Sequence, residues 1–144
     1  MIETVALDAG PLERLAHPAR NREIATWLER LLLADVTVAI PDLLDYEVRR
    51  SFLLEGLTIS VDRLDSLRVS LKFLAINSEA MLKAAELWAN VRRRGLPTAD
   101  PKELDGDVIL AAQALQIDAT VATENVGHLS LFVSACNWKS IGVE

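Results

Sequence analysis

The sequence predicts an α/β domain with a central parallel sheet between helical layers, and three observations support this prediction. Runs of β-branched residues alternate along the chain with segments whose apolar residues recur at helical spacing. The strand-like runs are strongly apolar, which is typical of strands buried on both faces. The length of 144 residues and the hydrophobic content of 51% suit one continuous core, so we expect a single domain over residues 1–144.

The N-terminal segment predicts a strand followed by a turn and a helix. The run from Ile2 to Leu7 favours a strand that stops at Asp8, and Gly10-Pro11 indicates a turn after it. Apolar residues at helical spacing then predict an amphipathic helix over Glu23–Leu33, with Asn21 as its N-cap.

The next segment predicts a second strand and a helix that continues directly from it. β-Branched residues over Val36–Ile40 favour a buried strand, which ends at Pro41. Proline is well tolerated in the first turn of a helix, and an apolar stripe follows it, so we expect a helix over Asp42–Glu55. Glu47 lies about a turn and a half into that helix.

The remainder of the chain continues the alternation of helices and strands. We expect helices over Ser60–Leu71, Glu79–Arg94 and Val108–Leu115, an exposed loop over Leu96–Glu103, and strands over Phe73–Ile76, Ala119–Thr123 and Trp138–Val143.

Composition limits the functional classes that the chain can belong to. The formal net charge of −6 argues against non-specific coating of nucleic acid, although a metal enzyme can still meet it because a cation inverts the local field of its carboxylates. Cys136 is the single cysteine, which excludes an internal disulfide and a multi-cysteine metal site. The chain shows neither a signal peptide nor an apolar run of the roughly 20 residues that a membrane span needs, so we expect a cytoplasmic protein without membrane contact.

Acidic residues from separate segments converge on one edge of the predicted sheet. Asp8 follows the first strand, Glu47 lies in the helix after the second strand, and Asp107 directly precedes the helix predicted from Val108. The functional crevice of a parallel sheet lies at the carboxyl ends of its strands. Clustered carboxylates repel one another unless they bind a proton or a cation, and hard oxygen ligands favour Mg²⁺ or Mn²⁺. Such an ion can support hydrolysis of a phosphodiester.

Four motifs in this order and spacing resemble the PIN-domain family of metal-dependent ribonucleases, which includes toxins of bacterial toxin–antitoxin pairs. The motifs are VALDAGPL from Val5, IPDLLDYEVRR from Ile40, DGDVILAAQAL from Asp105 and VATENVGHL from Val121. The resemblance implies a PIN-like three-layer α/β/α sandwich, an RNA substrate, Mg²⁺ or Mn²⁺ as cofactor, a cognate antitoxin and a homodimer.

The resemblance also implies roles for particular residues. Asp8, Glu47 and Asp107 take the places of the metal-binding acids, with Asp105 as an auxiliary ligand. The fourth acidic position is occupied by Asn125, which can position a water but adds no charge, and Thr123 supports it by hydrogen bonding.

Two departures from the family pattern keep alternatives open. Gly10 stands where a small polar residue is common, and Asn125 replaces an acid; Glu124 and Glu103 are candidates to compensate. A degenerate PIN domain that binds RNA or protein without cleaving it is therefore the main alternative. A phosphatase-like hydrolase of another doubly wound fold is a second, although no aspartate stands two residues after Asp8.

Several of these features also have purely structural interpretations. Asp8 can be a turn former, Glu47 a solvated helix residue, and Asp105 or Asp107 an N-cap. Two further groups of side chains each have more than one interpretation. A group of basic residues can be a solvated helix end or an RNA-facing rim, and a run of apolar residues can mark an oligomer contact. The basic residues are Arg92–Arg94 with Arg49, Arg50 and Lys102, and the apolar residues are Leu53, Leu54, Leu57, Ile59 and Val61.

Overall fold

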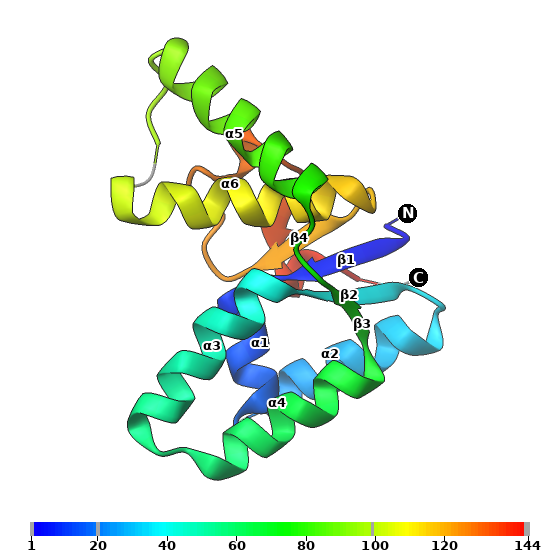
Figure 1. Cartoon of the computed structure of the whole chain (residues 1–144). Helices are drawn as coiled ribbons and strands as arrows, with labels where there is room; N and C mark the ends of the chain where they lie inside the picture. The colour runs from blue at the N-terminus through cyan, green and yellow to red at the C-terminus, as the bar shows by residue number, and fades with distance from the viewer. Residues whose placement is uncertain (1, 20, 99, 143–144) are drawn as a thin grey trace.

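A computed structural model describes residues 2–19, 21–98 and 100–142 of the chain (Figure 1). Five parallel strands form one sheet in the order β3-β2-β1-β4-β5. Strand β1 is central, so its C-terminal end lies in the middle of the sheet edge at which all five strands end. The strands are β1 (Thr4–Leu7), β2 (Thr37–Pro41), β3 (Lys72–Leu74), β4 (Thr120–Thr123) and β5 (Ala135–Asn137).

Helices cover both faces of the sheet, which confirms the predicted three-layer α/β/α sandwich (Figure 1). One layer contains α5 and α6, and the other contains α1 to α4. The helices are α1 (Ala9–Ala16), α2 (Arg22–Leu33), α3 (Asp42–Glu55), α4 (Thr58–Ser70), α5 (Ser78–Arg93) and α6 (Pro101–Gln116). Across the described ranges, no helix combines the length and apolar character needed to cross a bilayer.

The turn predicted at Gly10-Pro11 is wrong, because these residues belong to helix α1. Asp8 is the N-cap of this helix, and its carboxylate Oδ1 accepts a hydrogen bond from the Ala9 backbone N–H at 2.7 Å. Pro11 falls in the first turn, where a missing N–H costs nothing. The chain therefore turns from strand to helix at Asp8 itself, which fixes this carboxylate at the sheet edge.

Helix α6 begins at Pro101 and not near Val108, so part of the predicted loop is helical. Proline is favoured at the first position of a helix, and Glu103 in the first turn interacts well with the helix dipole. Asp105 and Asp107 consequently lie inside the helix, and neither is its N-cap.

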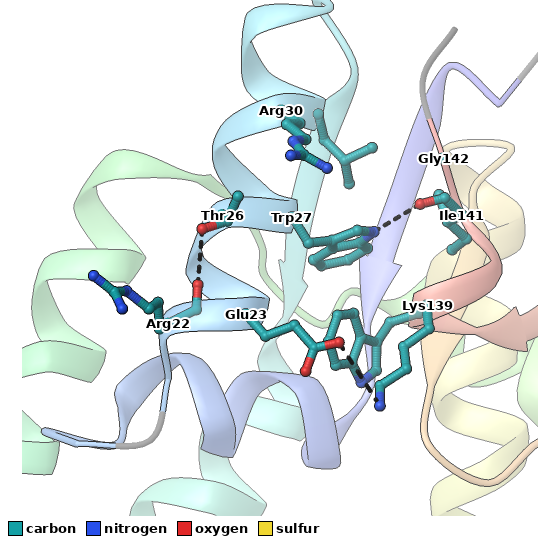
Figure 2. Close-up of a pocket in the computed structure, with 10 residues that line it drawn as sticks. Arg22, Glu23, Thr26, Trp27, Arg30, Lys139, Ile141 and Gly142 are labelled. Carbon is teal, nitrogen blue, oxygen red and sulfur yellow. Dashed lines mark hydrogen bonds and ion pairs between the residues drawn. The ribbon is translucent and has the colours of Figure 1, made fainter.

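The strand predicted over Trp138–Val143 is also misplaced. The last strand is β5, and residues Trp138–Ser140 form a 3-10 turn; Val143 lies outside the described residues. Two contacts explain this turn. The Asn137 side chain accepts a hydrogen bond from the Lys139 N–H at 2.9 Å, and the Trp27 indole N–H donates to the Ile141 carbonyl at 2.8 Å (Figure 2).

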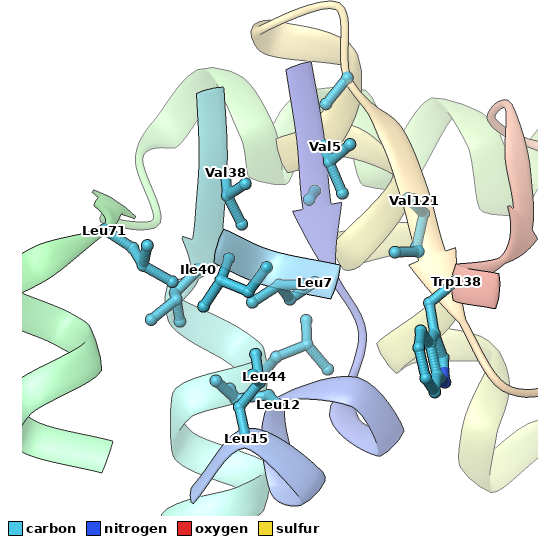
Figure 3. Packing of buried hydrophobic residues seen from close by; sticks show 14 of the residues in the cluster. Val5, Leu7, Leu12, Leu15, Val38, Ile40, Leu44, Leu71, Val121 and Trp138 are labelled. Carbon is cyan, nitrogen blue, oxygen red and sulfur yellow. The ribbon is translucent and has the colours of Figure 1, made fainter. Parts of the chain in front are cut away.

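The main core lies between the sheet and the layer of helices α1 to α4. Residues Val5 and Leu7 of the central strand are fully buried, and Leu12 and Leu44 from α1 and α3 pack beneath them (Figure 3). A second, smaller core lies around α5 and α6 and includes Leu104 and several alanines. These two cores hold α3 and α6 on either side of the C-terminal ends of β1 and β2.

Candidate metal-binding site

A polar cleft of about 330 Å³ lies between α3 and α6 at the C-terminal end of β1. Four carboxylates reach it from three segments that are far apart in the sequence. Its lining residues are Asp8, Leu44, Glu47, Arg50, Glu103, Gly106, Asp107 and Leu110. The structure therefore brings Asp8, Glu47 and Asp107 together, as the sequence predicts.

Asp8 is held in one orientation by two neighbours. Its Oδ1 accepts the Ala9 N–H, and its Oδ2 accepts the Thr123 hydroxyl at 2.8 Å. Thr123 is only 2% exposed and ends the adjacent strand β4. The backbone N–H of Asn125 donates to the same hydroxyl at 3.2 Å, so the oxygen of Thr123 is itself fixed. The strand end thus orients the central carboxylate before any ligand binds.

Removing the Thr123 hydroxyl tests this orientation. In Thr123→Val the side-chain shape is kept, but Asp8 loses a charge-assisted hydrogen bond, which is worth about 1.5–3 kcal/mol in typical proteins. We expect a clear loss of metal affinity with a folded protein, measured by metal titration. Thr120→Val on the same strand is the matched control, because its hydroxyl donates to the Ser134 hydroxyl at 3.3 Å, away from the cleft. Equal metal affinity in both variants would contradict this role.

Glu47 and helix α6 approach each other closely at Gly106. A Cβ atom placed on Gly106 would lie 3.2 Å from Glu47 Oε1, which is tighter than ordinary van der Waals contact. Gly106 therefore leaves room for the Glu47 carboxylate. The sequence interpretation missed this role, although a glycine one residue before a candidate ligand within an apolar helix was a signal for it.

A methyl group at Gly106 should weaken metal binding without lowering the stability of the protein. In Gly106→Ala, the helix gains about 0.5–1 kcal/mol of intrinsic stability, and the flexible Glu47 side chain is displaced at little cost. We expect an unfolding midpoint equal to or above that of the wild type in urea, with weaker metal binding by calorimetry. Unchanged metal affinity would show that Glu47 has no fixed place in the site.

Uncompensated negative charge marks this cleft. Burial, together with the charges of Asp8, Glu103 and Glu47, raises the pKa of Asp107 from 3.8 to about 6. Burial also raises the pKa of Glu47, where Arg50 acts in the opposite direction and Asp8 and Glu103 add to the increase. Such carboxylates favour the binding of a proton or a cation.

The residues present suit a divalent cation in kind. All four carboxylates are hard oxygen donors, the type that Mg²⁺ and Mn²⁺ prefer. Within the described part of the chain, no three acidic, histidine or cysteine side chains already stand as ligands of one ion. Binding would therefore require the longer side chains of Glu47 and Glu103 to turn inward around the fixed Asp8.

Three other acidic or amide candidates do not reach the cleft. Asp105 is exposed and lies beside Met81 and Trp88 in the groove between α5 and α6. Asp105 and Asp107 point in nearly opposite directions because residues two positions apart in a helix are separated by about 200° around its axis. Asn125 has an exposed side chain outside the cleft lining, and only its backbone contacts Thr123. The phase of α6 therefore separates Asp105 from Asp107.

Glu124 is engaged elsewhere, by an ion pair with Arg14 of α1. Its side chain lies over Gly10, where an added Cβ would be 3.0 Å from the Glu124 Cγ. Of the two acids considered as replacements for a fourth ligand, only Glu103 lines the cleft. It stands four residues before Asp107, on the same face of α6.

A larger hollow of about 590 Å³ lies beside α2 and the C-terminal segment (Figure 2). Among the described residues that line it, the one carboxylate is that of Glu23, whose Oε1 lies 3.8 Å from the Lys139 ammonium nitrogen. Trp27 and Trp138 form its floor as buried core residues in an edge-to-face pair. The described lining of this hollow offers a single carboxylate, whereas the acidic cleft offers four, so the smaller cleft is the candidate site.

Comparison with known proteins places the fold. No family model and no curated protein matches the sequence. Among solved structures, FitAcB from Neisseria gonorrhoeae is 22% identical with a TM-score of 0.75, covering 95% of this chain and 99% of that one. VapBC2 from Rickettsia felis, bound to a DNA fragment from its promoter, is 20% identical with a TM-score of 0.71, covering 94% and 98%. The fold of this chain is that of the PIN domain.

VapBC-1 from nontypeable Haemophilus influenzae is also similar, at 19% identity and a TM-score of 0.70 over 95% of this chain and 99% of that chain. The likeness extends over nearly the full length of each of these neighbours. At such identities it establishes the fold, whereas the chemistry has to be argued from the cleft.

Proposed function

We propose that this protein is a Mg²⁺- or Mn²⁺-dependent endoribonuclease that acts as the toxin of a toxin–antitoxin pair. The observation that supports this proposal most is the cleft itself, in which carboxylates from β1, α3 and α6 face one another without enough positive charge. A metal-binding role accounts for this otherwise unfavourable arrangement. The PIN fold adds an analogy to nucleases, since its structural neighbours include VapBC and FitAB proteins.

Each residue of the cleft has a distinct task in this proposal. Asp8, Glu47 and Asp107 would hold the metal, with Glu103 in the auxiliary place first given to Asp105. The bound ion would lower the pKa of a water and offset charge on the phosphodiester. Thr123 keeps Asp8 oriented through its hydroxyl, and Gly106 keeps space for Glu47. Asn125 would act through its backbone by fixing Thr123.

A protein partner is part of the proposal. Three of the similar structures, VapBC2, FitAB and VapBC from Salmonella typhimurium, are bound to DNA, and the DNA in the VapBC2 structure is a promoter fragment. We infer that an antitoxin joins this chain to a promoter. The tip of the α3–α4 hairpin exposes an apolar surface that a partner or a second copy in a homodimer would cover. Its exposed side chains are Leu53 at 63%, Leu54 at 88%, Leu57 at 42% and Ile59 at 62%. We place this activity in the cytoplasm, where RNA is available.

The main alternative is a degenerate PIN domain that binds RNA or protein without cleavage. Its strongest argument was the amide at Asn125. Since that side chain lies outside the cleft lining and Glu103 lies within it, the cleft retains four carboxylates. This observation favours the enzyme over the binding module.

Cleavage of a panel of structured RNAs tests the proposed function. Purified wild-type protein, Asp8→Asn and Asp105→Asn are each incubated with Mg²⁺, Mn²⁺ or a chelator. We expect metal-dependent cleavage by the wild type and by Asp105→Asn, and none by Asp8→Asn. Cleavage by Asp8→Asn at the wild-type rate, or no cleavage by the wild type with either metal, would support the binding module instead.

A further inference from the structure

Arg50 has an unusual place in the acidic cleft. It is the single cation among the described residues that line the cleft, and it faces four carboxylates there. Its charge lowers the pKa of Glu47, so its guanidinium lies close enough for electrostatic interaction. A cation at this place either serves only to balance the acids or binds an anion from outside.

The contacts of Arg50 favour binding from outside. Among the described residues, no carboxylate lies within ion-pair distance of its guanidinium. Instead, this group lies over the ring of Tyr46, 5.1 Å from the ring centroid, and Tyr46 is 58% exposed. Stacking on an aromatic ring orients a guanidinium without using its hydrogen-bond donors. Arg50 is thus oriented but retains its donors.

Its neighbour Arg49 shows the contrast. Arg49 donates to Asp45 and, at 2.7 Å, to Asp65, so its donors are used within the protein. The two adjacent arginines of α3 therefore have different tasks, one internal and one directed to the cleft. The three arginines Arg92–Arg94 of the α5 end are not among the cleft residues.

The charge of an RNA strand determines what Arg50 can bind. Even with one divalent ion, four carboxylates leave the cleft negative, and they repel the phosphates on either side of the bond to be cleaved. Arginine binds phosphate oxygens through two parallel N–H donors. We propose that Arg50, stacked on Tyr46, binds a backbone phosphate of single-stranded RNA at the cleft. The identity of this anion rests on the proposed function.

Binding measured without cleavage tests this role. Fluorescence anisotropy of a labelled single-stranded RNA is followed over a range of salt concentrations, with a chelator present to prevent metal-dependent cleavage. Wild type is compared with Arg50→Gln, Arg50→Lys and the matched control Arg30→Gln, an exposed arginine of α2. Thermal unfolding of each variant confirms that it is folded.

The two possible roles of Arg50 give different salt dependences. If Arg50 binds phosphate, Arg50→Gln weakens RNA binding about tenfold and reduces the slope of log affinity against log salt by about 0.7, the value for one contact to a single strand. Arg50→Lys restores the slope because it keeps the charge. Arg30→Gln behaves as the wild type.

The outcomes also separate this proposal from the proposed function. If Arg50→Gln binds RNA with the affinity and slope of Arg30→Gln, or if the wild type does not bind RNA, the proposal is overturned, even where the wild type cleaves RNA with Mn²⁺. If the slope falls as expected but the wild type cleaves nothing with either metal, the proposal is supported and the nuclease function fails.

Discussion

Asp107→Asn should stabilise the metal-free protein at pH 7.5 by about 1 kcal/mol and abolish its metal-dependent cleavage of RNA. The folded protein raises the pKa of Asp107 from 3.8 to about 6, so it holds this proton more tightly than the unfolded chain does. Wild-type stability therefore falls as the pH rises from about 4 to about 6, and it is level above that window. For a fully buried carboxyl, this pKa change would correspond to a stability change of about 3 kcal/mol. The effect is smaller here because solvent screens the half-exposed Asp107 carboxyl.

Urea unfolding in chelator at pH 4.5 and pH 7.5 measures this effect. The neutral amide cannot repel Asp8, Glu47 and Glu103, so the variant should lose less stability than the wild type between the two pH values. Asp105→Asn is the matched control, since it removes a carboxylate from the same helix but outside the cleft. If the free energy of unfolding fell between pH 4.5 and pH 7.5 by as much in Asp107→Asn as in Asp105→Asn, the proposed repulsion between Asp107 and the other cleft carboxylates would be contradicted.

Asp45→Asn should destabilise the protein by about 2–4 kcal/mol, although Asp45 lies outside the cleft. Its buried carboxylate accepts Arg49 Nε at 2.9 Å and Arg49 Nη2 at 3.1 Å, and Arg68 Nη1 lies 3.5 Å away. Removing one partner of a buried pair leaves the other uncompensated, which typically costs 3–5 kcal/mol. The cost is smaller here because Arg49 is partly exposed and keeps Asp65 as a partner.

The exposed partner of the same network is the control. The Asp65 side chain is 57% exposed, and exposed ion pairs contribute less than about 1 kcal/mol, so Asp65→Asn should have a small effect on the urea midpoint. Both variants should retain metal binding, because the network joins α3 to α4 and not to the cleft. Equal losses of stability in the two variants would show that burial of Asp45 has no special importance.

Local signals in the sequence predicted those elements whose ends are clearly marked. The bounds of α3 agree with the prediction because Pro41 precedes it and Gly56, at φ +72°, ends it in the left-handed conformation. Helix α1 was missed because Gly10-Pro11 has the composition of a turn. The start of α6 was missed because two prolines hid the helical spacing before Val108.

The candidate site was predictable as far as strand ends and helix phases allow. Parallel strands bring their carboxyl ends to one edge, so the convergence of Asp8, Glu47 and Asp107 follows from the order of the elements. Whether Asp105 or Asp107 faces the cleft depends on where α6 lies against α3, which no local pattern specifies. The pairing of Glu124 with Arg14 joins residues 110 positions apart and could not be read from spacing.

Calorimetric titration of the full chain with Mn²⁺ tests the central claim that the cleft binds a divalent cation. We expect saturable binding by the wild type and by Asp105→Asn, and a loss of at least tenfold in affinity for Asp107→Asn. Absence of binding to the wild type, or equal affinity in Asp107→Asn and Asp105→Asn, would contradict the assignment of the acidic cleft as a metal site.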